Sequence, residues 1–287
     1  MTGPDAGLAV PLMVLGSLLA HRRENRGYSR AAAAAAVNAP ESAIADLENG
    51  RNRLRMRDLV ALCDLYEVED HAERVTMLGL AAQPGGRAWW AEYREAIPPW
   101  LDAFLGLEQA AAVIRGFEIQ HVPGLLQTAG YARAVIGLGL GDAAPPEAVD
   151  LRVRLRLRRQ EILRRPDPPH AWMIIDESVL CRPVGGPRVM FAQIEHLIDL
   201  CARPNVTIQI LRFDACRRVE PCGPVTLLRQ HETRLVDIAY LEDLISGTFV
   251  SHRRDVDYYR HALNRLAVHA EPADRTPDIL RRFLSLL

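Results

Sequence analysis

Residues 28–57 read YSRAAAAAAVNAPESAIADLENGRNRLRMR, and this stretch decides the fold of the first third of the chain. Ser29 can cap a helix that continues through six alanines, the residue with the highest helix propensity. After a short turn, Pro40 suits the first turn of a second helix over residues 41–48, and Gly50 ends it. The stretch therefore predicts two helices joined by a tight turn.

Helical patterns continue on both sides of this pair. A leucine stripe at Leu12, Leu15, Leu18 and Leu19 predicts an amphipathic helix over residues 11–25. Apolar residues at helical spacing predict two more helices, at residues 57–66 and 70–81. We therefore expect an all-α five-helix domain over residues 1–82.

The rest of the chain has a different pattern. Residues 83–86, Gln-Pro-Gly-Gly, are a plausible linker, and a second domain is expected over residues 87–287. Within it we predict helices at residues 100–114, 151–165, 188–202, 255–270 and 278–287, a short apolar segment at 117–122, and strands at 170–176, 205–211, 223–230 and 235–242. Strands and helices do not alternate regularly, which favours a mixed α/β domain with a central sheet. The fold class of the whole chain is then α+β.

Charge and composition narrow the class of protein. The 287 residues carry a formal net charge of −1, and all 35 basic residues are Arg. Residues 1–82 hold nine Arg against eleven acidic residues, although a dedicated nucleic-acid binder usually has a basic excess. No apolar run reaches the roughly 20 residues that span a bilayer, so we expect a cytoplasmic protein with no membrane contact. The five cysteines form no metal-ligand spacing, and neither a metal nor a cofactor is predicted.

The order and spacing of the predicted helices resemble Xre/Cro-type helix-turn-helix regulators. The resemblance rests on Leu15-Gly16, the LENGR at residues 47–51 and the RDLVALCDLYEV at 57–68. It continues through RRQEILRR at 158–165, IIDE at 174–177 and RPVGG at 182–186, and so points to the actinobacterial branch that has a long C-terminal, antitoxin-like domain. What the resemblance implies is a regulator, often encoded beside a small partner protein, and no reaction.

In this fold the helix at residues 41–48 enters the major groove, so its outward side chains decide DNA reading. We expect Glu41 and Ser42 near bases, with phosphate contacts from four arginines: Arg30, Arg51, Arg53 and Arg55. Relatives commonly carry polar or basic residues where this chain has Ala43, Ala45 and Asp46, which weakens the expected DNA binding. The alternative role of these arginines is a solvated loop that pairs with Asp46, Glu48 and Asp58.

Besides a purely structural antitoxin-type partner of a small neighbouring protein, two main hypotheses follow from the sequence. The leading one is a dimeric transcriptional regulator that binds DNA through the head and senses a ligand or a protein partner through the C-terminal domain. The other is a repurposed regulator homologue that has lost specific DNA binding and binds or transforms a small metabolite without a cofactor, as a cyclase or an isomerase. Its ligand-binding candidates are Trp89, Trp90, Trp100, Tyr131 and Trp172.

Catalytic residues belong only to the second hypothesis. His121, and Asp176 with Glu177 at the end of a predicted strand, are titratable groups that could serve in acid–base chemistry. A carboxylate pair in that position more often caps the next helix. Enzyme activity is therefore not the leading prediction.

Overall fold

A computed structural model describes residues 10–52, 55–69, 73–74, 77, 81, 89–141, 143–217, 219, 222–230, 237–243, 246–250 and 253–287. The chain forms two compact units. The first comprises Met1–Arg94, Pro98–Ala110 and Gln230–Val236, and the second comprises Glu95–Ile97, Ala111–Arg229 and Asp237–Leu287. None of the described helices is long and apolar enough to cross a membrane.

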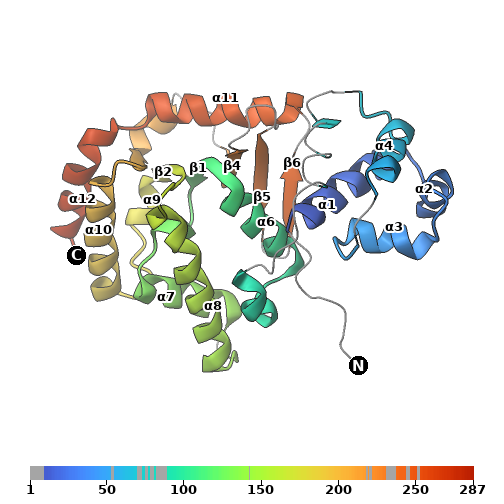
Figure 1. Cartoon of the computed structure of the whole chain (residues 1–287). Helices are drawn as coiled ribbons and strands as arrows, with labels where there is room; N and C mark the ends of the chain where they lie inside the picture. Colours follow the sequence, from blue (N-terminus) through green and yellow to red (C-terminus); the bar gives the residue numbers. More distant parts are fainter. Residues whose placement is uncertain are drawn as a thin grey trace. The chain divides into compact units, whose positions relative to one another are not determined.

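The head of the chain is helical, as predicted. Its elements are α1 (Val10–Asn25), α2 (Arg30–Ala36), α3 (Glu41–Glu48) and α4 (Met56–Leu65), followed by a 3-10 segment η1 (Trp89–Ala96) and by α6 (Pro99–Ala110) (Figure 1). Ser29 caps α2 by accepting a hydrogen bond from the Ala32 amide at 3.1 Å. Gly50 follows α3 with a φ of 64°, a conformation that glycine adopts without strain. Most of the predicted helix at 70–81 lies outside the described residues, and so does the linker at 83–86.

In the helix-turn-helix, α3 packs against α1. The predicted stripe of α1 is buried, and Ile44 and Leu47 of α3 are each 1% exposed. Gly16 allows the closest approach: a β-carbon there would lie 2.2 Å from the carbonyl oxygen of Leu47 and 2.7 Å from that of Glu48. Any side chain at position 16 would therefore push the two helices apart.

The second unit is built on a mixed six-stranded sheet. The strands are β1 (Ala111–Glu118), β2 (His170–Asp176), β3 (Val206–Leu211), β4 (Val225–Gln230), β5 (Ile238–Glu242) and β6 (Gly247–Val250). They lie in the order β3-β2-β1-β4-β5-β6, with β1, β2 and β3 parallel and β4, β5 and β6 antiparallel. The predicted fold class, α+β with a mixed C-terminal sheet, is confirmed.

One sequence prediction was wrong at this point. The expected helix over residues 100–114 ends with α6 at Ala110, and Ala111 begins the central strand β1. Ala111 and Ile114 are 0% and 1% exposed, so a strand buried on both faces lacks the alternation that identifies half-buried strands. The short strand β6 was also not predicted.

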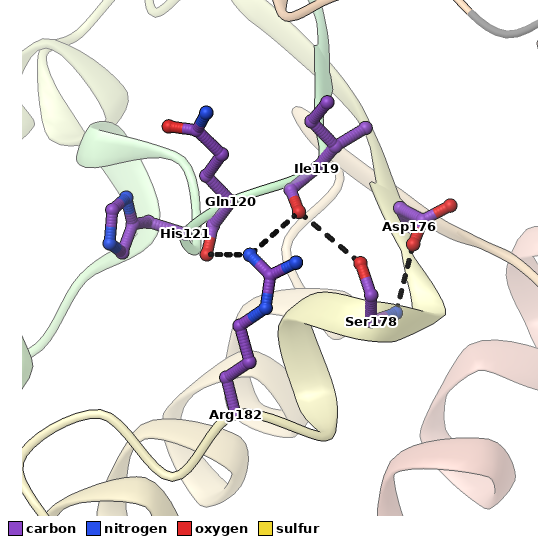
Figure 2. Close-up of a pocket in the computed structure, with 6 residues that line it drawn as sticks. All are labelled: Ile119, Gln120, His121, Asp176, Ser178 and Arg182. Atoms are coloured by element: carbon purple, nitrogen blue, oxygen red, sulfur yellow. Dashed lines mark hydrogen bonds between the residues drawn. The ribbon is translucent and has the colours of Figure 1, made fainter. Parts of the chain in front are cut away.

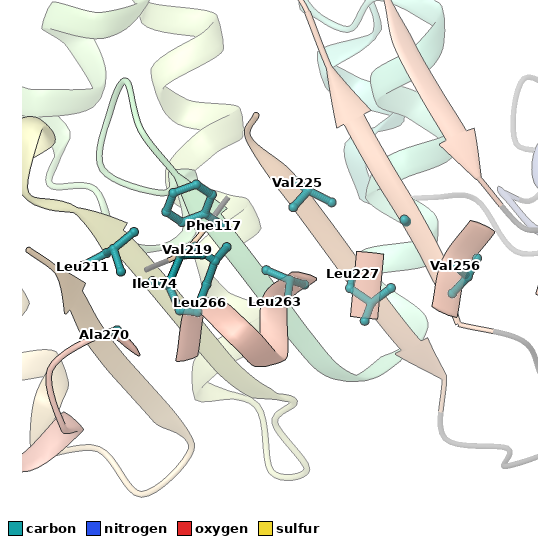
Figure 3. Packing of buried hydrophobic residues seen from close by; sticks show 11 residues of the cluster. Phe117, Ile174, Leu211, Val219, Val225, Leu227, Val256, Leu263, Leu266 and Ala270 are labelled. Carbon is teal, nitrogen blue, oxygen red and sulfur yellow. The ribbon is translucent and has the colours of Figure 1, made fainter. Parts of the chain in front are cut away.

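Helices complete the second unit. They are α7 (Ala129–Leu140), α8 (Pro146–Arg159), α9 (Glu177–Leu180), α10 (Pro187–Cys201), α11 (Arg253–His269) and α12 (Thr276–Leu284), with 3-10 turns η2 (Gly124–Leu126), η3 (Gln160–Arg164), η4 (Phe213–Arg217) and η5 (Ala273–Arg275). The expected helix at 151–165 is α8 continued by η3. Leu263 and Leu266 of α11 pack against Phe117 and Leu227 of the sheet (Figure 3). Met173, which alternates with the core residue Ile174 along β2, is buried too, so both faces of the sheet are covered.

Candidate nucleic-acid interface and polar pocket

The second helix of the predicted pair, α3, presents short or acidic side chains. Glu41 and Ser42 are exposed at its N-terminal end, and Ala43, Ala45 and Asp46 are half-buried. Among these five, the groups able to hydrogen-bond a base edge are the Ser42 hydroxyl and the two carboxylates. The helix therefore has the position of a DNA reader but few polar side chains that could read sequence.

A buried ion pair network holds α1, α2 and α3 together. Glu48, whose side chain is 3% exposed, accepts hydrogen bonds from Arg23 Nε at 2.5 Å and from Arg23 Nη2 at 3.1 Å. It also accepts one from Arg30 Nε at 2.7 Å. Arg23 Nη1 in turn donates to the carbonyl oxygen of Tyr28 at 2.9 Å. The hydrogen bonds to Glu48 raise the pKa of Arg23 above its ordinary value, so its charge is fixed.

The network gives Arg30 a defined position. Its side chain is 45% exposed while its Nε is held by Glu48, so part of the guanidinium still faces solvent at the start of α2. The predicted phosphate contact would therefore use an arginine that is already anchored.

The other predicted phosphate-binding arginines differ in their partners. Arg51 lies 4.0 Å from Asp46 and is 73% exposed, whereas Arg55 donates to Asp58 at 2.7 Å and is 64% exposed. Arg53 lies outside the described residues. Pairing with Asp46, Glu48 and Asp58 thus occurs as the alternative interpretation expected. The exposed pairs of Arg51 and Arg55 are each worth roughly 0–1 kcal/mol, so these two side chains are able to turn towards a phosphate.

The predicted aromatic residues are divided between the two units. Trp89, Trp90 and Trp100 belong to the first unit, where Trp90 is buried and donates to Asp102 at 2.5 Å. In the second unit, the Tyr131 hydroxyl accepts a hydrogen bond from the buried Val122 amide at 3.2 Å.

Trp172 also has a packing role. Its ring lies 4.5 Å from the Arg115 guanidinium, and its Nε1 donates to Gln209, whose own amide donates to carbonyl groups of α11 and of the turn after it. Core packing and satisfied hydrogen bonds account for Tyr131 and Trp172.

Two of the three candidate catalytic residues line a pocket at the ends of β1 and β2. This pocket, of about 510 Å³, is lined by Ile119, Gln120, His121, Asp176, Ser178 and Arg182. Figure 2 shows the residues after β1 facing those after β2 across it. Burial lowers the pKa of His121, and the positive charges of Arg156 and Arg182 lower it further, so its imidazole is neutral at pH 7.

The carboxylates at this edge have structural roles. Asp176 caps α9 by accepting a hydrogen bond from the Ser178 amide at 2.9 Å. Glu177 is buried and does not line the pocket. It accepts a hydrogen bond from the Phe213 amide at 2.9 Å and forms an ion pair with Arg212 at 3.3 Å. Glu177 therefore ties α9 to the segment after β3. Capping, the alternative considered for the pair, applies to Asp176.

Sequence reasoning missed Ser178 and Arg182 as pocket residues. Arg182 Nη1 donates to the carbonyl oxygens of Ile119 and Gln120 at 3.3 and 3.4 Å, and Ser178 Oγ donates to that of Ile119 at 3.2 Å. A signal was present, because both residues follow a predicted strand at its carboxyl end, where open α/β sheets bind ligands.

A second charged cluster lies beside the segment VPGLLQ at residues 122–127. Arg156 of α8 donates from Nη1 to Oε1 of the buried Gln127 at 2.8 Å. Gly124 lies against it, since a β-carbon there would be 3.9 Å from Arg156 Nε and 3.4 Å from Arg159 Nη1. Arg156 of α8 is thus held by the packed segment at 122–127 and does not belong to a solvated helix face.

Glu118 is the carboxylate of this cluster. Burial raises its pKa to about 7, with a smaller contribution from Glu242, while Arg159 and Arg156 act in the opposite direction. Burial and the charge of Arg159 lower the pKa of Arg156 to about 10. No three His, Cys, Asp or Glu side chains in the described part of the chain are grouped so that they could hold a metal ion.

Two models of known protein families match the chain, one in the helical head and one in the part that contains the sheet. A family model described as a helix-turn-helix domain matches residues 14–76. A second, described as a domain of unknown function, DUF5753, matches residues 101–282. No curated protein and no solved structure matches the chain.

Proposed function

The chain belongs to the DUF5753 family and carries a helix-turn-helix domain before it, and on this basis we propose that it is a DNA-binding transcriptional regulator. The observation that carries the proposal is the helix-turn-helix itself. Its second helix α3 is closed against α1 through Ile44 and Leu47, and its N-terminal residues Glu41 and Ser42 are exposed. We further propose that the domain is of the Xre/Cro type and of the actinobacterial branch.

In this proposal, contacts to the DNA phosphates supply most of the binding affinity. Arg30, Arg51 and Arg55 are exposed or half-exposed around α2, α3 and the start of α4, where cations can meet phosphates. Ser42 and Glu41 lie near base edges and supply little discrimination, because Ala43 and Ala45 cannot hydrogen-bond. Binding should therefore be strongly salt-dependent and only weakly sequence-selective.

The second domain supplies the regulation in this proposal. It senses a small molecule or a small protein partner, and the protein acts as a cytoplasmic homodimer that places two heads on successive major grooves. These assignments go beyond the two family matches and rest on the resemblance to regulators of this organisation.

A fluorescence anisotropy titration tests DNA binding. The probe is a labelled duplex from the region upstream of the protein's own gene, at about 50 mM salt, where phosphate contacts are strong. Saturable binding that weakens as salt rises is expected. Absence of binding to this duplex and to an unrelated one at the same salt would refute the proposal.

The alternative is a metabolite-binding or metabolite-transforming protein without specific DNA binding. Two observations favour it. His121 and Asp176 line the polar pocket, and α3 has few side chains that can hydrogen-bond a base edge. Under this alternative, DNA binding is absent or equal for all sequences, and substitution of Asp176 or His121 abolishes turnover of a metabolite. Sequence-selective DNA binding would exclude it.

A further inference from the structure

We propose that the pocket at the carboxyl ends of β1 and β2 binds a small zwitterion that carries a carboxylate and an ammonium group, such as an amino acid. The inference deepens and rests on the proposed function, in which the second domain senses a ligand. It identifies where the ligand binds and which chemical class it belongs to.

The position of the pocket follows from the parallel pairing of two strands. Glu118 pairs with Ile175, so β1 and β2 end at the same edge of the sheet and their following segments face each other. Ligands of open α/β sheets bind outside the carboxyl ends of neighbouring parallel strands. The volume of about 510 Å³ lies within the range of small-molecule sites.

The guanidinium of Arg182 is the group that would bind the carboxylate of the ligand. Its Nη1 makes two long hydrogen bonds, at 3.3 and 3.4 Å, to the carbonyl oxygens of Ile119 and Gln120, which hold the group over the pocket (Figure 2). In the described part of the chain no partner occupies its Nη2 and Nε. Arginine binds carboxylates through two parallel N–H bonds, and such charge-assisted bonds are about twice as strong as neutral ones.

The carboxylate of Asp176 is the group that would bind the ammonium of the ligand. Its Oδ1 accepts the capping hydrogen bond from the Ser178 amide, and among the described residues nothing occupies its Oδ2. The capping bond fixes the carboxylate at the pocket wall. Ser178 Oγ donates to the carbonyl oxygen of Ile119, so its hydroxyl oxygen can still accept a hydrogen bond from the ligand.

The charge balance selects a zwitterion over other ligands. Arg182 and Asp176 compensate each other, and the imidazole of His121 is neutral at pH 7 because burial and the nearby arginines lower its pKa. A phosphate dianion would place two negative charges beside the Asp176 carboxylate, which repels them and has no ligand ammonium to bind. A simple amine would leave Arg182 without a partner.

Isothermal titration calorimetry on the full chain, with the twenty common amino acids as probes, tests the inference. For each binder, the decarboxylated amine, the corresponding hydroxy acid and inorganic phosphate are titrated as comparisons. We expect at least one amino acid to bind with a Kd below about 1 mM, and each comparison compound to bind at least tenfold more weakly, which is about 1.4 kcal/mol.

Three variants assign the site. Arg182→Gln and Asp176→Asn should each weaken amino acid binding at least tenfold. Both should fold, since Arg182 is exposed and Asn caps helices as well as Asp does. Arg188→Gln, which removes an exposed arginine of α10 outside the pocket, should leave the affinity unchanged.

The inference is overturned if no amino acid binds at about 10 mM, if an amine, hydroxy acid or phosphate binds as tightly, or if the affinity survives both pocket substitutions. DNA anisotropy on the same preparations separates this failure from that of the proposed function. Amino acid binding without DNA binding would refute the regulator alone, and DNA binding without amino acid binding would refute the pocket assignment alone.

Discussion

Substitution of Glu48 by Gln should loosen the helix-turn-helix, because this carboxylate of α3 accepts hydrogen bonds from Arg23 of α1 and Arg30 of α2. The exposed fractions of its side chain and of Arg23 are 3% and 8%, so the pair is buried. Removing one partner of a buried pair costs about 3–5 kcal/mol. The Gln oxygen keeps one acceptor, worth about 1 kcal/mol, and the expected loss of stability in the head is therefore about 2–4 kcal/mol.

Hydrogen exchange measured by mass spectrometry locates this loss. Amides of α1 and α3 that exchange through opening of the head should exchange roughly thirtyfold to a thousandfold faster in Glu48→Gln, since each factor of ten is about 1.4 kcal/mol. Asp46→Asn is the matched control, because Asp46 pairs with Arg51 at 4.0 Å on the surface. It should change exchange by less than about fivefold, equivalent to roughly 1 kcal/mol.

Equal exchange rates in Glu48→Gln and the control would refute the reasoning. The buried network would then contribute no more than a surface ion pair, and apolar packing alone would close the head.

Three further changes have expected outcomes. Gly16→Ala places a β-carbon 2.2 Å from the Leu47 carbonyl oxygen, so thermal unfolding of the head should occur at a markedly lower temperature. Gly137→Ala in α7 is the control, because its β-carbon meets nothing within 4 Å, and it should stabilise the protein by about 0.5–1 kcal/mol. Ser29→Ala removes the cap of α2 and should cost about 1 kcal/mol in urea unfolding followed by circular dichroism, with Ser29→Asp as a variant that retains it. For Glu118, burial raises the pKa from 4.5 to about 7, so the folded state binds the proton more tightly and stability should fall as pH rises from 4.5 to 7, by up to about 3 kcal/mol. Glu118→Gln should remove that pH dependence, and a wild-type stability that is constant or rises over this range would contradict the assignment.

The head could be predicted because its signals are local. Ser29 caps the helix that it precedes, Gly50 has the positive φ that ends α3, and the leucine stripe of α1 has the helical period. Each of these depends on residues within one or two turns, and no distant contact is needed to interpret them. Ile44 and Leu47 of α3 both face the core and lie three residues apart, a spacing that places them on one side of a helix.

The sequence indicated single residues of the pocket but not their assembly, which depends on strand pairing across a long separation. Ile119 to His121 follow β1, Asp176 ends β2 and Ser178 and Arg182 follow it, and the register of the two strands brings them together. Predicting a helix through Ile114 took the first half of β1 as helix, so the strand whose carboxyl end forms this edge was not recognised. Side-chain type was a poor guide as well, because the tryptophans and Tyr131 suggested a pocket and lie in two separate units.

The central claim is that the head binds DNA through phosphate contacts, and the salt dependence of binding tests it most directly. Anisotropy titrations at several salt concentrations give the slope of log K against log salt, which is about −0.9 for each phosphate neutralised. The double variant Arg51→Gln, Arg55→Gln should reduce the magnitude of the slope by about two, whereas Arg188→Gln on the second unit should leave it unchanged. An unchanged slope in the double variant, or no binding by the wild-type chain, would contradict the account.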